Sequence, residues 1–170
     1  MNTELMYIMK QDKKLEILAA TNKTSGRFGL VLSPQDALMI AEEEKNTLKE
    51  HRRIELGEGI APRIIYEFCD SAYIDQQCYA ETIVRLQEIF YIYKNEMLDN
   101  ISDEELLCVM KEFFEYVCRG DLDFLENTCL ADFAEAVRAG YDGYKISGGR
   151  GEYRKFAADY DDFIEEREMP

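Results

Sequence analysis

The chain has 170 residues, enough for one domain with a substantial core, and its hydrophobic fraction of 46% is ordinary for a globular protein. Its charge is unusual, because 35 Asp and Glu residues against 20 Lys and Arg residues give a formal net charge of -15. A surface this acidic repels phosphate backbones and anionic membranes. We therefore expect no nucleic acid and no membrane as a partner.

The first 27 residues give no clear secondary structure, since their apolar positions allow either a helix or short strands. Glu4 stands where a signal peptide carries basic residues, and no apolar run approaches the ~18 residues of a membrane span. These features predict a cytoplasmic protein. Residues 21–26 predict a loop, and the apolar residues 28–32 predict a short extended segment.

A helix is predicted to begin after Ser33, which caps it, with Pro34 at its first position, where a missing N–H costs nothing. We expect the helix to end near His51. Residues 42–44, three glutamates, are predicted to face water. The positions expected to face the core are Ala37, Leu38, Ala41 and Leu48. Two glycines among residues 57–59 then predict a turn with unusual backbone angles.

The central element is predicted at about residues 75–98. Its apolar stripe, with alternating steps of four and three residues, consists of Tyr79, Ile83, Leu86, Phe90, Tyr93 and Met97. Within residues 89–93 every face of the helix is apolar or aromatic. A helix that is apolar all round is usually buried all round, so we expect the other helices to pack around this one.

Residues 101–140 predict further helices with well-marked ends. Ser102 and Glu105 fit a capping box, and Gly120 and Gly140 are predicted stops. Asp121 and Thr128 are predicted caps of two shorter helices. The predicted fold class is therefore mainly α, a helical bundle around the central helix with one short extended segment near residues 28–32.

The composition changes after residue 140. Four glycines fall within residues 143–151, and an acidic stretch follows, with Phe156, Tyr160, Phe163 and Ile164 at roughly helical spacing. We predict a helical domain at 1–140, followed at 141–170 by a glycine-rich loop and an acidic C-terminal segment that is either docked or mobile.

The number and spacing of the cysteine and histidine residues predict that the protein binds no metal and no cofactor. The five cysteines are Cys69, Cys78, Cys108, Cys118 and Cys129. Their odd number and wide spacing are typical of reduced, mostly buried thiols rather than of zinc ligands. With a single histidine the chain also lacks every site that needs two imidazoles. Acidic pairs such as Glu81 with Glu88 lack the E-x-x-H motif of helical di-metal sites.

The strongest polar cluster consists of His51, Arg52, Arg53 and Glu55, beside the glycine turn. A histidine, two guanidinium groups and a carboxylate at a helix end are suited to binding an anion or transferring a proton, with His51 and Glu55 as the candidate catalytic residues. Cations near a helix C-terminus also satisfy the helix dipole and the last carbonyls, and this structural role is the favoured interpretation.

Four stretches carry a family resemblance, namely residues 28–37 (FGLVLSPQDA), 52–60 (RRIELGEGI), 89–96 (IFYIYKNE) and 101–106 (ISDEEL). From Phe28 to about Tyr141 the chain resembles an uncharacterised family of cytosolic proteins from Gram-positive, mostly anaerobic bacteria. The resemblance implies a bacterial, cytosolic origin, and it implies no activity and no site.

Three functions follow as hypotheses. The favoured one is a non-catalytic helical protein that acts through another protein or through self-association. The first alternative is a small enzyme or anion-binding protein that uses His51, Arg52, Arg53 and Glu55. The second alternative is an acidic mimic of nucleic acid that occupies the groove of a basic protein, which requires acids aligned along one surface at phosphate-like spacing.

Overall fold

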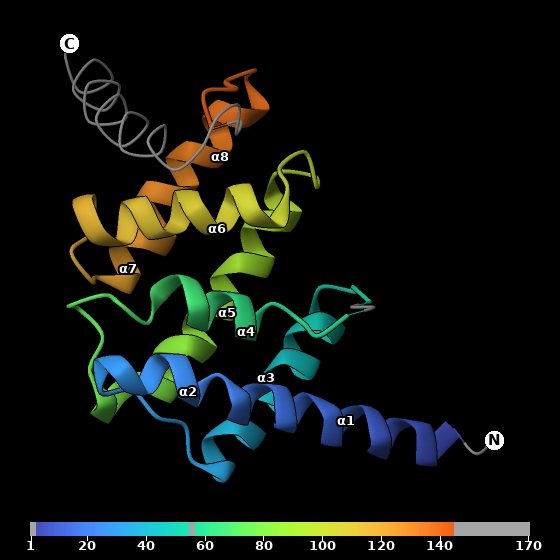
Figure 1. Ribbon diagram of the computed structural model, residues 1–170. Helices are drawn as coiled ribbons and strands as arrows, with labels where there is room; N and C mark the ends of the chain where they lie inside the picture. The colour runs from blue at the N-terminus through green and yellow to red at the C-terminus, as the bar shows by residue number, and fades with distance from the viewer. Residues whose placement is uncertain (1–2, 55–56, 145–170) are drawn as a thin grey trace. The chain divides into compact units, whose positions relative to one another are not determined.

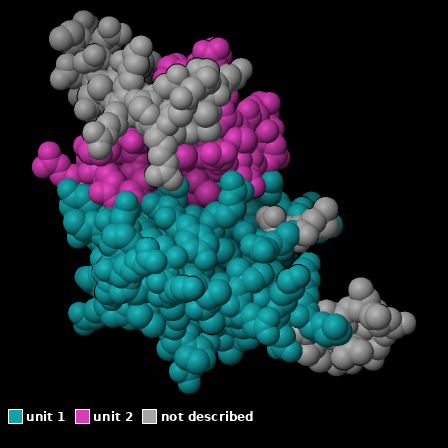
Figure 2. Space-filling model, in the orientation of Figure 1, with its two compact units in different colours: residues 1–92 teal, residues 93–170 magenta. Residues whose placement is uncertain are grey.

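The computed structural model describes residues 3–54 and 57–144, with side-chain positions from residue 9 onward. The chain divides into two compact units, residues 1–92 and residues 93–170, which are coloured separately in Figure 2. All regular secondary structure in the described part is helical and none of it is strand, so the prediction of a mainly α fold is confirmed. The predicted boundary near residue 140 stays a prediction, because residues 145–170 lie outside the described part.

Unit 1 contains most of the longer helices (Figure 1). They are α1 (Thr3–Ala20), α2 (Asn22–Ser25), the 3₁₀ turn η1 (Gly26–Phe28), α3 (Pro34–Glu50), α4 (Ala61–Phe68), the 3₁₀ turn η2 (Gln76–Cys78) and the first part of α5 (Tyr79–Glu96). Helix α1 packs against α3 and α4. Residues 3–20 are thus a helix, one of the two possibilities that the sequence left open.

Helix α3 begins as predicted, and it buries the predicted positions Ala37, Ala41 and Leu48, but Leu38 and Glu44 differ from the prediction. Ser33 Oγ accepts a hydrogen bond from the Asp36 N–H, and the Asp36 carboxylate accepts one from the Ser33 N–H. The start of the helix is therefore a full capping box. Leu38, predicted to face the core, is 46% exposed. Glu44, predicted to face water, is only 2% exposed. The buried positions are Ala37, Ile40, Ala41, Glu44, Thr47 and Leu48.

The segment between η1 and α3 is extended, and side chains replace the neighbouring strand that it lacks. Asn22 donates to the Leu32 carbonyl and accepts from the Leu32 N–H. Gln76 makes the same pair of bonds with the peptide groups of Val31, at 2.7 and 2.9 Å. Ser25 bonds both peptide groups of Leu30, one through its hydroxyl and one through its carbonyl. All six N–H and C=O groups of residues 30–32 are therefore satisfied.

Helix α5 is buried as its sequence predicts. Asp75 accepts a hydrogen bond from the Cys78 N–H and starts the helical path, which continues into α5 at Tyr79. Every residue of the predicted stripe is buried, and so are Ile89 and Tyr91 on other faces of the helix. The Phe90 and Tyr91 rings meet edge to face with centroids 5.2 Å apart.

Unit 2 consists of the end of α5 and a run of shorter helical segments. These are α6 (Asp103–Glu112), the π-helical turn η3 (Phe113–Val117), α7 (Leu122–Phe124), the π-helical turn η4 (Leu125–Cys129) and α8 (Leu130–Arg138). The capping box of Ser102 and Glu105 and the Asp121 cap are present as predicted. Thr128 lies within η4 and caps no helix, so that prediction is wrong.

The core of unit 2 is aromatic, and its buried polar groups bind main-chain carbonyls. Phe133 lies edge to face with Phe113, Tyr141 and Tyr144. The Tyr93 hydroxyl donates to the Glu126 carbonyl. The Lys94 ammonium, only 9% exposed, donates to the Ile101 carbonyl and contacts Asp103 at 2.8 Å. These bonds hold the loop between α5 and α6 and the last turn of α5 together.

Two helices end in a Schellman turn without the usual glycine. At the end of α3 the Arg53 N–H bonds the Leu48 carbonyl and the Arg52 N–H bonds the Lys49 carbonyl, with Arg52 at φ 55°. At the end of α5 the same pattern places Leu98 at φ 53°, and Asp99 follows at φ 58°. The predicted stops Gly120 and Gly140 have φ angles of 88° and 108°, as expected for left-handed caps.

Candidate functional site

The predicted polar cluster lies at the Schellman turn of α3. His51 is the capping residue directly after α3, and Arg52 and Arg53 follow it within the turn. The three residues are thus adjacent at the negative end of the helix dipole, which the two guanidinium groups stabilise. Glu55 lies outside the described residues, so the pairing of His51 with Glu55 stays a prediction. Arg52 is exposed and Arg53 half-buried, and the turn itself explains their position.

A second polar group in unit 1 escaped the sequence analysis. The Lys14 ammonium of α1 contacts the Glu44 carboxylate of α3 at 2.9 Å, and the two side chains are 12% and 2% exposed. The carboxylate also lies against the backbone of Gly59, where a Cβ atom would come within 2.5 Å of its oxygens. The carboxylate therefore joins α1, α3 and the glycine turn, and Gly59 has room for it because it lacks a side chain.

This buried pair is suited to holding unit 1 together. A carboxylate this deeply buried is costly unless a cation and hydrogen bonds compensate it, and Lys14 supplies the cation. The spacing of Ala37, Ala41, Glu44 and Leu48 places Glu44 in the middle of the buried stripe of α3. That spacing indicated from the sequence that Glu44 would be buried. It was overlooked because Glu44 belongs to a run of three glutamates, which was assigned to the solvent-exposed face as a whole.

Unit 2 has a different electrostatic character. Residues 1–92 contain 15 acidic and 11 basic side chains, a net charge of -4, whereas residues 93–144 contain 13 acidic and 4 basic side chains, a net charge of -9. Three of those four cations already contact carboxylates: Lys94 contacts Asp103, Lys111 contacts Glu115 and Arg138 contacts Glu96. The described part of unit 2 therefore carries a large uncompensated negative charge.

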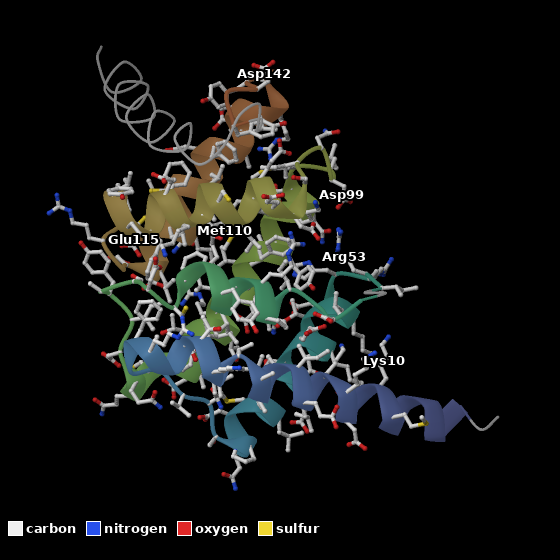
Figure 3. The ribbon with its side chains drawn as sticks, in the orientation of Figure 1. Lys10, Arg53, Asp99, Met110, Glu115 and Asp142 are labelled. Carbon is white, nitrogen blue, oxygen red and sulfur yellow. The ribbon has the colours of Figure 1, made fainter. Side chains whose placement is uncertain are left out.

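Seven of the thirteen carboxylates among residues 93–144 are exposed, namely Glu96, Asp99, Glu104, Asp121, Asp123, Glu135 and Asp142. Figure 3 labels Asp99, Glu115 and Asp142, which lie at three separate places around the unit. They come from the loop after α5, from η3 and from the loop after α8. The negative field thus surrounds the unit and is not confined to one row of acids.

Large apolar side chains are exposed among these acids. Leu98 is 73% exposed, and the exposed aromatic residues are Tyr116, Phe124 and Tyr141. Leu98 is also the residue that the Schellman turn of α5 holds in the left-handed region. Such side chains, surrounded by charge, are suited to contact with another protein, because aromatic residues contribute most to the binding energy of interfaces.

The thiols and carboxylates of the described residues form no group of three or more that is able to hold a metal ion. Cys69 is buried in α4, where its thiol contacts the Tyr66 carbonyl at 3.9 Å, as its apolar surroundings predicted. Cys108, Cys118 and Cys129 are also buried, and Cys78 is exposed. The prediction that no metal binds stays a prediction, and its check is elemental analysis of the purified protein.

The comparison with protein families gives one result. Residues 16–143 match DUF6323, a family of unknown function. The chain belongs to this family. The match contains all four sequence stretches that carried the resemblance, so the family extends over both units of this DUF6323 protein. No curated protein and no solved structure matches the chain. None of the helices in the described part combines the length and apolar character that a membrane span needs.

Proposed function

We propose that this DUF6323 protein is a non-catalytic binding module whose unit 2 binds a protein with a lysine- and arginine-rich surface. The observation that carries the proposal is the net charge of -9 on residues 93–144, with three of the four cations of that stretch already paired. A field of this size attracts a basic partner over distances beyond direct contact and accelerates association.

The exposed apolar side chains supply the short-range part of the interaction. Charge complementarity governs the rate of encounter and the choice of partner, whereas buried aromatic and aliphatic anchors contribute most of the affinity. Tyr116, Phe124 and Leu98 are available for that purpose. Two copies of so acidic a chain repel one another, which favours a different protein over self-association. A cytoplasmic location in a Gram-positive bacterium, which the family resemblance implies, belongs to this proposal.

The two alternatives receive less support. The enzyme or anion-binding hypothesis depends on His51, Arg52, Arg53 and Glu55, and a Schellman turn already accounts for the first three. The nucleic-acid mimic is a narrower form of the basic-partner proposal, and it requires acids in a row. The carboxylates of unit 2 instead come from separate elements. This arrangement favours a partner with a broad basic surface over a partner with a nucleic-acid-binding groove.

The test uses a synthetic helical peptide with lysines on one face and leucines on the other as the model partner. Its affinity for the full-length protein is measured by fluorescence anisotropy at low and high salt. The triple variant Asp99→Asn, Glu135→Gln, Asp142→Asn removes three exposed charges of unit 2. We expect binding to weaken about tenfold, from roughly 0.5 kcal/mol per charge, and to weaken further as salt increases.

The matched control removes three exposed charges from unit 1 with Glu42→Gln, Glu50→Gln and Glu81→Gln. We expect the control to change the affinity less than twofold, because these residues lie in the weakly charged unit. Equal weakening by both variants would show that any acidic surface attracts the peptide. That result, or the absence of binding at low salt, contradicts the proposal.

A further inference from the structure

The most unusual pair of reactive side chains in the described residues is Cys118 with Cys129. Both thiols are buried, with exposed fractions of 7% and 0%. Their sulfur atoms are 3.4 Å apart, close enough for one thiol to donate a weak hydrogen bond to the other. The proposed binding function makes no use of this pair, and the two cysteines are eleven positions apart in the chain.

The backbone brings the thiols together through two π-helical turns. Cys118 follows η3, and its N–H bonds the Phe113 carbonyl at 2.7 Å, five residues earlier. Cys129 is the last residue of η4, which contacts η3. Between them Arg119 and Gly120, at φ 49° and 88°, reverse the chain. Because a π turn adds one residue to a helical turn, it changes the direction in which the following side chain points.

We propose that Cys118 and Cys129 form a modification site, at which a peroxide or a low-molecular-weight disulfide converts the two thiols into a reversible disulfide. The sulfur atoms need to approach by roughly 1.3 Å to reach the bond length of about 2.05 Å. Each thiol lies within one short helical hairpin, so the movement is local.

The reaction with a peroxide proceeds in two balanced steps. One thiol loses its proton, and the thiolate attacks the peroxide, which gives a sulfenic acid and releases hydroxide from the other peroxide oxygen. The sulfur of the second cysteine then attacks the sulfenic sulfur, and the proton of the second thiol and the sulfenic hydroxyl leave as water. The peroxide is reduced by two electrons, and the two thiols are oxidised to one disulfide. A dithiol reductant reverses the change.

The surroundings make this pair slow to react but specific in its product. The hydrogen bond with Cys129, burial and the nearby Asp121 carboxylate all raise the pKa of the Cys118 thiol. The Cys118 thiolate is therefore scarce at neutral pH, and oxidation that begins at Cys118 should be faster at pH 8.5 than at pH 7.5. Once one sulfur is oxidised, its neighbour at 3.4 Å is the nearest available thiol among the described cysteines.

The test uses the full chain with Cys78→Ser, which removes the exposed thiol that would cross-link separate molecules. The protein is treated with hydrogen peroxide or oxidised glutathione at pH 7.5 and 8.5, and remaining thiols are alkylated. Trypsin cleaves after Lys111, Arg119 and Arg138, so Cys118 and Cys129 fall in separate peptides, 112–119 and 120–138. Before alkylation we expect the intact mass to fall by about 2 Da. After alkylation we expect two fewer thiols to be labelled, and these two peptides to be joined until reductant is added.

Two single variants, Cys118→Ala and Cys129→Ala, should each abolish the cross-linked peptide pair. Cys108→Ala, which removes another buried thiol of unit 2, should leave the product unchanged. Circular dichroism shows whether each variant is folded. The peptide mapping of the Cys78→Ser protein tests the proposal even if the alanine variants do not fold, because that protein carries no substitution in the core. If Cys118 and Cys129 of the Cys78→Ser protein can still be alkylated after oxidation at pH 8.5, or if the cross-link joins other cysteines, the proposal is wrong.

Discussion

The two units use ionisable side chains in opposite ways. Unit 1 keeps its charges nearly balanced and buries a carboxylate, Glu44, against a partner ammonium, Lys14. The described part of unit 2 leaves seven of its thirteen carboxylates exposed and buries groups that bind main-chain carbonyls, namely the Lys94 ammonium and the Tyr93 hydroxyl. The first arrangement stabilises a fold internally, and the second leaves a strong external field. The difference explains why the binding function is proposed for unit 2.

The largest expected effect concerns the core aromatic residues of the two units. Phe90→Ala in unit 1 and Phe113→Ala in unit 2 should each lower the free energy of unfolding by about 3–5 kcal/mol, since both rings are at most 1% exposed. Urea denaturation followed by circular dichroism measures the loss. Tyr73→Ala, at a half-exposed ring, should change stability by less than about 0.5 kcal/mol and is the control. A near-neutral Phe90→Ala variant would mean that α5 is not a core helix.

The buried ion pair of unit 1 provides the next test. Glu44→Ala should lower the free energy of unfolding by about 3 kcal/mol, because it leaves Lys14 without its partner in a largely buried position. Glu42→Ala, two residues away and exposed, should cost less than about 0.5 kcal/mol in the same urea titration.

A double variant separates the charge from the packing at this site. Lys14→Met combined with Glu44→Leu should recover most of the stability lost in Glu44→Ala, because apolar residues of similar volume replace a buried pair with little net cost. If the double variant is no better than the single one, the carboxylate acts through its contact with the Gly59 turn and not through Lys14.

In unit 2 the corresponding test is a pH titration. Burial and the nearby Glu126 carboxylate raise the pKa of Tyr93 from 10.0 to about 12. The folded state therefore holds the phenolic proton more tightly than the unfolded state does, and this stabilisation is complete below pH 10 and disappears as the pH rises toward 12. The urea concentration at the midpoint of unfolding is measured between pH 8 and pH 11. Above pH 10 this midpoint should fall less steeply with pH for Tyr93→Phe than for the unsubstituted protein. Parallel curves would show that Tyr93 is not responsible.

The smallest expected effect concerns the two Schellman turns, one in each unit. Arg52→Gly and Leu98→Gly should each raise the free energy of unfolding by about 0.5–1 kcal/mol, since glycine occupies the left-handed region without steric cost. Lys49→Gly, within helix α3, should instead lower it by about 1 kcal/mol. Stabilisation by only one of the two glycines would show that the other non-glycine residue makes compensating contacts.

Much of the fold was predictable because local chemistry specifies helix ends. Ser33, Ser102 and Asp121 cap helices, and Gly120 and Gly140 end them, as their sequence context indicates. The burial of α5 followed in the same way from its apolar pattern. Short-range bonds of this kind join residues within about six positions of each other, so a single sequence contains the information.

The remaining features depend on contacts between residues far apart in the chain. Glu44 is buried because Lys14 lies 30 positions earlier and Gly59 leaves space for it. Cys118 meets Cys129 because two π turns rotate the thiols together, and neither turn has a sequence signature comparable to a cap. For the candidate cluster, the sequence placed His51, Arg52 and Arg53 at a helix end, which is confirmed. No sequence pattern indicated that the non-glycine residues Arg52 and Leu98 would occupy left-handed positions.

The extended segment before α3 has a consequence for aggregation. Residues 28–32 form a short uncharged and mostly apolar run, and such runs stack into cross-β fibrils when their backbone is open to another chain. In the folded protein Asn22, Ser25 and Gln76 already occupy every peptide N–H and C=O of residues 30–32, so an incoming strand finds no hydrogen-bonding edge there. Because Asn22 and Ser25 belong to the adjoining helical turns and Gln76 to η2, fibril growth from this stretch must wait for unit 1 to open.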